Sequence, residues 1–169
     1  MPKKRRSFEQ GHRRKYLVIV DESQEVESAL YFAASRIGHS VGGGIKLLYV
    51  IEPHADYTHW VGVRQVQIEE EQAKAKALFR LFRMKLTTGG FDNVVVEEDV
   101  REGKKVETIL KVIDEDEDIG ILVLGAAVDN RGPGPLVASL ATGKFAGTFP
   151  IPVVIVPGEL KLEDITSMA

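Results

Sequence analysis

Two apolar runs near the carboxyl end decide the fold of this chain: Ile119-Gly-Ile-Leu-Val-Leu-Gly125 and Ile151-Pro-Val-Val-Ile-Val-Pro157. Consecutive apolar residues of this length are typical of parallel strands that are buried on both faces. A loop rich in glycine and proline, followed by a short helical run, separates the two strands. In a parallel α/β sheet, ligands bind beyond the carboxyl ends of the strands. Gly125, which ends the first run, therefore marks the predicted binding site.

The residues before this stretch repeat the alternation of strands and helices. Strands are predicted at residues 16–20, 45–51, 91–97, 119–124 and 152–156. Helices are predicted from about residue 24 to residue 37, over 65–86, over 104–113, and in the run between the last two strands. Ser23 is a candidate N-cap for the first helix. This order predicts one parallel, doubly wound α/β sheet with helices on both faces.

The helix predicted over residues 65–86 has apolar residues at three- and four-residue spacing, which indicates a face turned toward the core. These residues are Ala73, Ala77, Leu78, Leu81, Phe82 and Leu86. Charged residues fill most of the other positions and are expected to face solvent.

Length and composition place the chain among ordinary globular proteins. Its 169 residues are expected to form one domain, with 44% hydrophobic and 28% charged residues. It has no cysteine, which excludes disulfides, thiolate metal sites and a cysteine nucleophile. Its apolar runs are all well short of the roughly 18 residues that span a membrane, and the amino-terminal stretch lacks the apolar core of a secretory signal. A cytoplasmic protein is the resulting expectation.

Charge is distributed unevenly along the chain. Residues 1–15 hold seven basic side chains and one acidic one, a formal charge of +6 within a net charge of −3. We expect residues 1–14 to form a disordered basic tail, although such a tail can also bind nucleic acid or anionic lipid. Residues 159–169 are expected to form a loose acidic tail, and the run from Asp114 to Asp118 a solvated loop.

The sequence shows no catalytic constellation, and an enzymatic role is not predicted. Gly143-Lys144 lacks the first glycine and the hydroxyl of a P-loop, and no dinucleotide fingerprint or nucleophile elbow is found. His54, Asp56 and His59 are metal-ligand types, but their spacing favours a surface loop, so no metal site is predicted.

The order and spacing of several motifs make the chain resemble the universal stress protein family. The motifs are Leu17-Val-Ile-Val-Asp21-x-Ser23, Leu47-Leu-Tyr-Val-Ile51, Ile121-Leu-Val-Leu-Gly125 and Pro152-Val-Val-Ile-Val-Pro157. The resemblance implies a Rossmann-like domain over residues 15–158, with a five-stranded parallel sheet in the order 3-2-1-4-5 and four helices. It also implies a homodimer formed through the last strand, by Val153, Val154, Ile155 and Val156.

The resemblance further implies an adenine-nucleotide site for ATP, ADP or AMP. Residue by residue, the family's cofactor-binding positions fall on Ile19, Asp21, Val50, Leu124, Gly125, Arg131 and Ser139. Nucleotide-binding members carry Gly-x2-Gly-x9-Gly-Ser/Thr after the fourth strand, but here the second and third glycines are replaced by Val128 and Ala138. Glycine at such positions lets a phosphate approach the backbone, so the loop is expected to be degenerate.

Three functions remain open at this point. The first is a homodimeric stress-response or regulatory protein with weak or altered nucleotide binding. The second is an ATP-binding switch, slowly hydrolysing, that uses Ser139, Arg131 and the glycines at 132 and 134. The third is nucleic-acid association through the basic amino-terminal residues.

Overall fold

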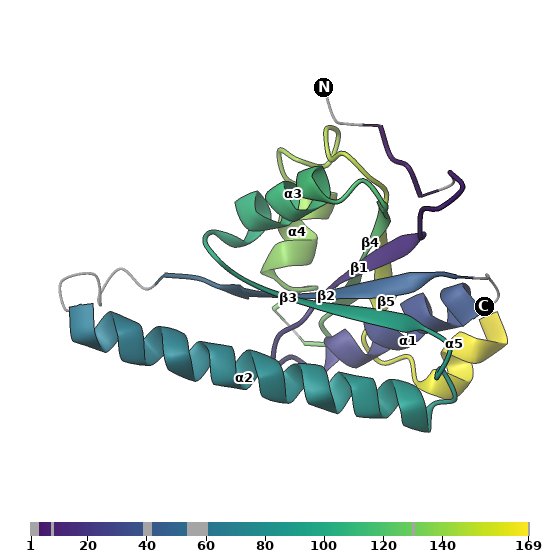
Figure 1. The fold of residues 1–169 in the computed structure, drawn as a ribbon, viewed down its shortest axis with the longest axis horizontal. Helices are drawn as coiled ribbons and strands as arrows, with labels where there is room; N and C mark the ends of the chain where they lie inside the picture. Colours follow the sequence, from purple (N-terminus) through teal and green to yellow (C-terminus); the bar gives the residue numbers. More distant parts are fainter. Residues whose placement is uncertain (1–3, 8, 39–41, 54–60, 130, 169) are drawn as a thin grey trace.

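The computed structural model describes residues 4–7, 9–38, 42–53, 61–129 and 131–168. One parallel sheet of five strands, in the order β3-β2-β1-β4-β5, runs through the molecule (Figure 1). The strands are β1 (Lys15–Ile19), β2 (Gly44–Ile51), β3 (Val95–Glu102), β4 (Ile119–Ala126) and β5 (Val153–Pro157). The helices are α1 (Glu25–Gly38), α2 (Val61–Thr88), α3 (Lys105–Glu115), α4 (Pro135–Ala141) and α5 (Leu162–Met168). The predicted class and strand order are confirmed, and five helices are present in the described ranges where four were expected.

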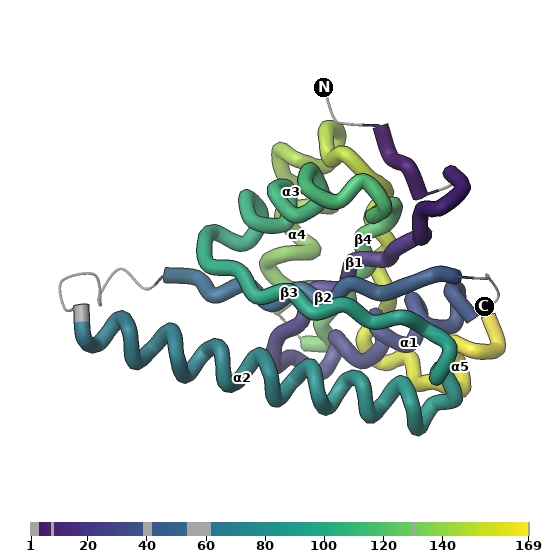
Figure 2. The backbone as a smooth tube through the Cα atoms, viewed as in Figure 1, coloured from purple at the N-terminus to yellow at the C-terminus, as the bar shows by residue number. Residues whose placement is uncertain are grey.

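Helices cover both faces of the sheet, with α1, α2 and α5 on one side and α3 and α4 on the other (Figures 1 and 2). Side chains along β1 alternate between the two layers: Val18 packs in the core beneath α1 and α2, while Leu17 and Ile19 pack beneath α3 and α4. This alternation follows from the two-residue repeat of a strand. It explains why a strand covered on both faces is apolar at every position.

Helix α2 buries only part of the face that the sequence pattern predicted: Phe82 and Leu86 are buried, and Leu78 packs against the core. Its inward residues are Ala75, Phe79, Phe82 and Leu86, which all belong to the core beneath α1 and α2. Ala73, Ala77 and Leu81 were expected in the core, but they are exposed. The prediction was wrong for these three residues because the helix carries apolar side chains on two opposite faces.

The carboxyl-terminal residues do not form a loose tail throughout. Residues 162–168 form α5, and Ile165 is fully buried. The Ser28 hydroxyl of α1 donates a hydrogen bond to the Leu160 carbonyl, with an oxygen–oxygen distance of 2.8 Å. One buried isoleucine and this anchor hold the acidic segment against α1.

Part of the basic amino-terminal segment also packs on the domain. Nη1 of Arg5 donates hydrogen bonds to the carbonyls of Ile113 and Asp116, at 2.7 and 3.1 Å. His12 Nδ1 lies 2.6 Å from the Asp118 carboxylate. Residues 4–7 and 9–14 thus differ from the expectation of a detached, disordered tail.

Asp116 lies inside the acidic run that was expected to be a solvated loop. Its carboxylate is mostly buried and pairs with Lys15 Nζ at 2.9 Å and with Lys46 Nζ at 3.2 Å. Two lysines from the sheet therefore neutralise part of this run. None of the helices in the described part of the chain has the length and apolar character needed to span a bilayer.

Candidate functional site

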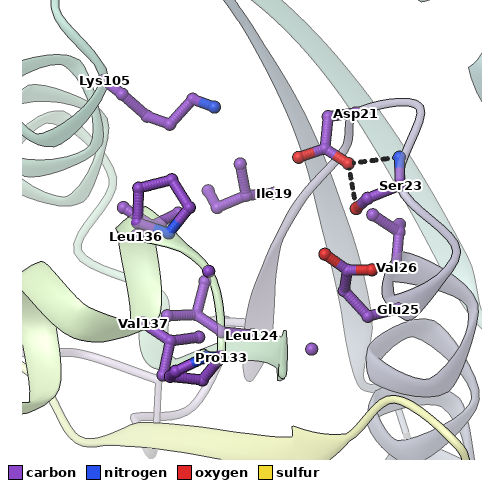
Figure 3. Close-up of a pocket in the computed structure, with 13 residues that line it drawn as sticks. Ile19, Asp21, Ser23, Glu25, Val26, Lys105, Leu124, Pro133, Leu136 and Val137 are labelled. Atoms are coloured by element: carbon purple, nitrogen blue, oxygen red, sulfur yellow. Dashed lines mark hydrogen bonds between the residues drawn. The ribbon is translucent and has the colours of Figure 1, made fainter. Parts of the chain in front are cut away.

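A pocket opens at the carboxyl edge of the sheet, between the ends of β1 and β4 and the start of α1 (Figure 3). It is lined by Ile19, Asp21, Ser23, Glu25, Val26, Lys105, Leu124, Gly125 and residues 133–137. The space inside it is about 70 Å³, whereas small-molecule sites typically enclose ~300–1,000 Å³. The pocket lies where the sequence predicted a binding site, but it is small for a whole nucleotide.

Asp21 follows β1 and contributes a carboxylate to this pocket. One of its oxygens, Oδ1, accepts hydrogen bonds from the Ser23 backbone N–H at 2.8 Å and from the Ser23 hydroxyl. Ser23 was expected to cap α1, but its hydroxyl donates to Asp21 instead. The other oxygen of Asp21 points away from Ser23, toward the side on which Lys105 lies (Figure 3). This second oxygen is available to accept a hydrogen bond from a ligand hydroxyl or amine.

Gly125 is required by the packing of β4 against α1. A Cβ atom built on Gly125 would lie 2.1 Å from the Glu25 carbonyl oxygen and 2.6 Å from its carbonyl carbon. Backbone atoms at the start of a helix cannot yield by that amount. Glycine at this position therefore has a structural reason that needs no ligand.

The loop after β4 folds back on itself beside the pocket. The Ala127 backbone N–H donates a hydrogen bond to the Pro133 carbonyl, with a nitrogen–oxygen distance of 3.0 Å. Gly132 and Gly134 make this turn with φ values of 99° and 104°, which glycine adopts without strain. Pro135 begins α4 and has no N–H to donate. The Ala127 N–H is thus already engaged, and Pro135 has no N–H. Neither residue can donate a backbone hydrogen bond to a phosphate.

The substituted positions of the family motif lie outside the pocket lining. Val128 is 58% exposed, and Ala138 is exposed on α4. Positive φ values in the described residues are confined to glycines, so Val128 is not strained in this loop. The loop therefore accommodates valine at this position without a glycine conformation.

The structure brings together four of the seven predicted cofactor-binding residues. Ile19, Asp21, Leu124 and Gly125 line the pocket. The other three are not part of its lining: Val50 is buried in the core beneath α3 and α4, and Arg131 and Ser139 are exposed.

Lys105 and Glu25 line the pocket, although the sequence analysis did not single them out. Lys105 begins α3, and its ammonium group extends toward the pocket (Figure 3). Its Nζ lies 3.8 Å from Glu52 Oε1. The signal for Lys105 was present, because it follows the carboxyl end of β3 and strand ends of a parallel sheet meet at one edge. Glu25 gave no such signal, because acidic residues are common in the first turn of a helix, where they interact favourably with the helix dipole.

The charge of the lining is unfavourable to a polyphosphate. Two carboxylates, Asp21 and Glu25, face the same space (Figure 3), and Lys105 is the one basic residue of the lining. Like charges brought together in a site weaken binding. The described residues contain no cluster of three or more histidine or acidic side chains that could hold a metal ion. His54, Asp56 and His59 lie outside the described residues.

The sheet order and the pocket at its carboxyl edge define a doubly wound α/β protein with a ligand-type cleft. The model of the universal stress protein family matches residues 12–157. The chain therefore belongs to the universal stress protein family. A comparison with curated proteins finds no match.

Solved structures share this fold at low sequence identity. Universal stress protein UspA from Lactobacillus plantarum is 20% identical, covers 86% of this chain and 99% of its own, and superposes with a TM-score of 0.63. A universal stress protein solved in complex with cAMP is 19% identical over 85% of this chain and 96% of its own, with a TM-score of 0.58. A family member from Arabidopsis thaliana, solved with AMP bound, is 18% identical over 85% of this chain and 90% of its own, with a TM-score of 0.52.

Proposed function

We propose that this protein is a homodimeric, regulatory member of the universal stress protein family that binds the nucleoside part of an adenine nucleotide and holds phosphates weakly. The hydrogen bond from the Ala127 N–H to the Pro133 carbonyl carries this proposal. It closes the loop after β4 on itself and engages a donor at the side where phosphates would lie. The AMP and cAMP bound to two proteins of similar fold support an adenine nucleotide as the ligand class.

The charges of the pocket also favour a site that binds the nucleoside and holds phosphates weakly. The free oxygen of Asp21 suits a ribose hydroxyl, because an ionised carboxylate accepts short, strong hydrogen bonds. Asp21 and Glu25 together oppose the negative charge of a triphosphate, and Lys105 offsets only one of them. Arg131, which an ATP-binding switch would use, is exposed, and its backbone N–H donates to Asp129 Oδ1 at 2.7 Å.

Calorimetric titration of the full chain with adenosine, AMP and ATP, with and without magnesium, tests this proposal. We expect adenosine and AMP to bind with similar affinity, and ATP to bind no more tightly than AMP in either condition. Tight binding of ATP that depends on magnesium would contradict the proposal and favour the switch.

Asp21→Asn tests the part of the site that contacts the nucleoside. An amide in this place loses the charge that strengthens the hydrogen bond, so the affinity for adenosine should fall about five- to tenfold. Glu22→Gln is the matched control, because Glu22 is the next residue, is exposed and pairs with Lys74 outside the pocket. Equal affinities for both variants and the wild-type chain would show that Asp21 is not a binding residue.

Association with nucleic acid receives less support from the described amino-terminal residues. The Arg5 guanidinium donates to backbone carbonyls of the domain. Arg6 pairs with Glu9 at 3.0 Å and lies 3.7 Å from Glu117. Basic side chains that already bind carbonyls or carboxylates of the same chain interact less strongly with the phosphates of a nucleic acid.

A further inference from the structure

The outward face of α2 carries apolar side chains that nothing in the described structure covers. Val63, Val66, Leu81 and Met84 are 43%, 54%, 38% and 59% exposed. They are half of the large hydrophobic residues that are exposed in the described residues. At 100° per residue, these four and the exposed alanines 73 and 77 fall within about 80° of one another, opposite Phe79. We call these six residues the outer stripe of α2.

Four residues of the outer stripe have the same spacing in both directions along the helix. Val66, Ala73, Ala77 and Met84 are separated by seven, four and seven residues. Small side chains lie at the centre, where two helices could approach closely, and larger ones lie toward the ends. A second copy of α2 laid antiparallel would set Val66 against Met84 and Ala73 against Ala77. The axis of such a pair would pass close to position 75.

We propose that the outer stripe of α2 is a self-association surface, which pairs antiparallel with the same stripe of a second copy of this chain. The proposal goes beyond the function proposed above and does not depend on it. Helices whose apolar residues recur at three- and four-residue spacing associate in this way, by packing side chains of one helix between those of the other. The outer stripe departs from that spacing between Val66 and Ala73, where Glu70 lies.

Charged residues beside the stripe match in this register. Glu69 and Arg80 lie on the same flank of α2, eleven residues apart, or about 16 Å along a helix. That separation is too large for an ion pair within one chain. In the antiparallel pair, Glu69 lies level with position 81 of the second copy, and so beside the second copy's Arg80. Symmetry makes this contact twice. Glu70, which lies on the same face of α2 between residues of the stripe, is level with the same arginine.

The size of the stripe makes this a weak interface by itself. From residue 63 to residue 84 the helix is about 32 Å long, so a strip about 10 Å wide buries about 300 Å² on each chain. Stable complexes bury roughly 1,200–2,000 Å² in total. We therefore expect pairing at high concentration or between chains that are already joined elsewhere.

The position of α2 allows this pairing alongside a dimer formed through β5. Helix α2 packs on β2 and β3, and β3 and β5 are the two opposite edges of the sheet. Both surfaces can be used at the same time, which would join two dimers into a tetramer or a chain of dimers.

Charge reversal on the flank of α2 tests the proposal. The full-length chain carrying Ile155→Lys, which removes pairing through β5, is followed by analytical ultracentrifugation over a concentration series. In that chain, Arg80→Glu or Glu69→Arg alone sets like charges against each other twice, and should weaken self-association about tenfold. The double variant Glu69→Arg/Arg80→Glu restores opposite charges between positions 69 and 80. It should associate more tightly than either single variant but less tightly than the parent, because Glu70 then lies level with a carboxylate.

Arg64→Glu is the matched control, because Arg64 lies on the opposite side of α2 and faces Glu102 of β3 at 3.8 Å. It should leave self-association unchanged, and Ala77→Glu, which places a charge at the centre of the stripe, should abolish it. Circular dichroism should show the same fold for all these variants, since every substituted residue on α2 is exposed. A parent chain that stays monomeric at all concentrations overturns the proposal. A double variant that remains as weak as the single variants overturns it equally.

Discussion

At the scale of single residues, the pocket depends on a glycine whose hydrogen faces a helix. The Glu25 carbonyl approaches Gly125 so closely that α1 could not lie where it does beside any larger residue. This contact sets the position of the first turn of α1. Asp21 and Glu25 flank that turn, so the glycine also sets the distance between the two carboxylates and β4.

Gly125→Ala should lower the free energy of unfolding by about 2–4 kcal/mol, because the added methyl group clashes with backbone that cannot move freely. Gly62→Ala is the control, since a Cβ atom on Gly62 meets no neighbour within 4 Å and alanine suits a helix better than glycine. Urea denaturation of both variants measures the difference. A Gly125→Ala chain as stable as the wild type would contradict the packing described for β4 and α1.

At the scale of elements, the end of α3 is fixed by ion pairs with the sheet. Burial opposes ionisation of Asp116, but hydrogen bonds from Lys15 and the Asp118 N–H and the charges of Lys15 and Lys46 outweigh it. Together they hold the pKa of Asp116 below its ordinary value. Burial likewise opposes the charge of Lys15, yet the hydrogen bonds and charges of Asp116 and Glu97 raise the pKa of Lys15 above its ordinary value.

These shifts predict how stability changes with pH. The lowered pKa of Asp116 stabilises the fold at pH values above about 4, and this contribution disappears as the pH falls through the folded-state pKa. The raised pKa of Lys15 stabilises the fold below about pH 10, and this contribution disappears as the pH rises through its folded-state pKa. Asp116→Asn should therefore cost about 1–3 kcal/mol at pH 7 and reduce the loss of stability between about pH 5 and pH 3.

Thermal unfolding over that pH range provides the measurement, with Asp92→Asn as the control. Asp92 is an exposed carboxylate in the turn before β3. Its replacement should leave the loss of stability between about pH 5 and pH 3 unchanged. If the wild-type and Asp116→Asn chains lose the same stability as the pH falls, a group other than Asp116 is responsible for that loss.

The sequence predicted best the strands that helices cover on both faces. Strands β1, β2, β4 and β5 are largely apolar because helices cover them, and the strand order followed from the resemblance to the family. Strand β3 was predicted at residues 91–97 but lies at Val95–Glu102, because most of its residues are charged and none is fully buried. Helix α2 was predicted with the correct inward positions Phe82 and Leu86, but Ala73 and Ala77 were wrongly included, because they are as apolar as Ala75. Periodicity alone cannot tell a core face from a second apolar face.

The site was predictable where neighbours in sequence are neighbours in space. Asp21 follows β1 directly, and Gly125 ends β4, so both were placed at the correct edge. The course of the loop after β4 was not predictable, because it depends on a hydrogen bond between Ala127 and Pro133 and on two glycines with positive φ. Lys105 reaches the pocket from another crossover, and its position after β3 was the one signal that placed it at the same edge of the sheet.

At the scale of the whole molecule, β5 is an open edge of the sheet. Ile155 in this strand is 40% exposed, while Val156 is buried within the chain. Unpaired backbone groups beside an exposed apolar side chain favour pairing with another strand. We therefore predict that a homodimer forms through this edge.

Ile155→Lys should convert the dimer to a monomer, because a charge on an edge strand opposes pairing with a second copy. Sedimentation equilibrium of the two chains at matched concentration gives the masses directly. Met168→Lys, a charge at an exposed position on α5, should leave the dimer intact. A wild-type chain that is monomeric at high concentration contradicts the predicted dimer. An Ile155→Lys/Ala77→Glu chain, in which pairing through α2 is also removed, contradicts formation through this edge if it is still dimeric.

The contact between Gly125 and α1 also bears on how chains of this family should be compared with one another. A residue that folding alone preserves persists in a lineage after its ligand has been lost, so the presence of Gly125 carries no information about binding. In this chain, the motif positions that can change when binding is lost are 128 and 138, because the fold tolerates a side chain larger than glycine there. Sequence surveys that weight those positions above the first glycine should separate binding from non-binding members more sharply.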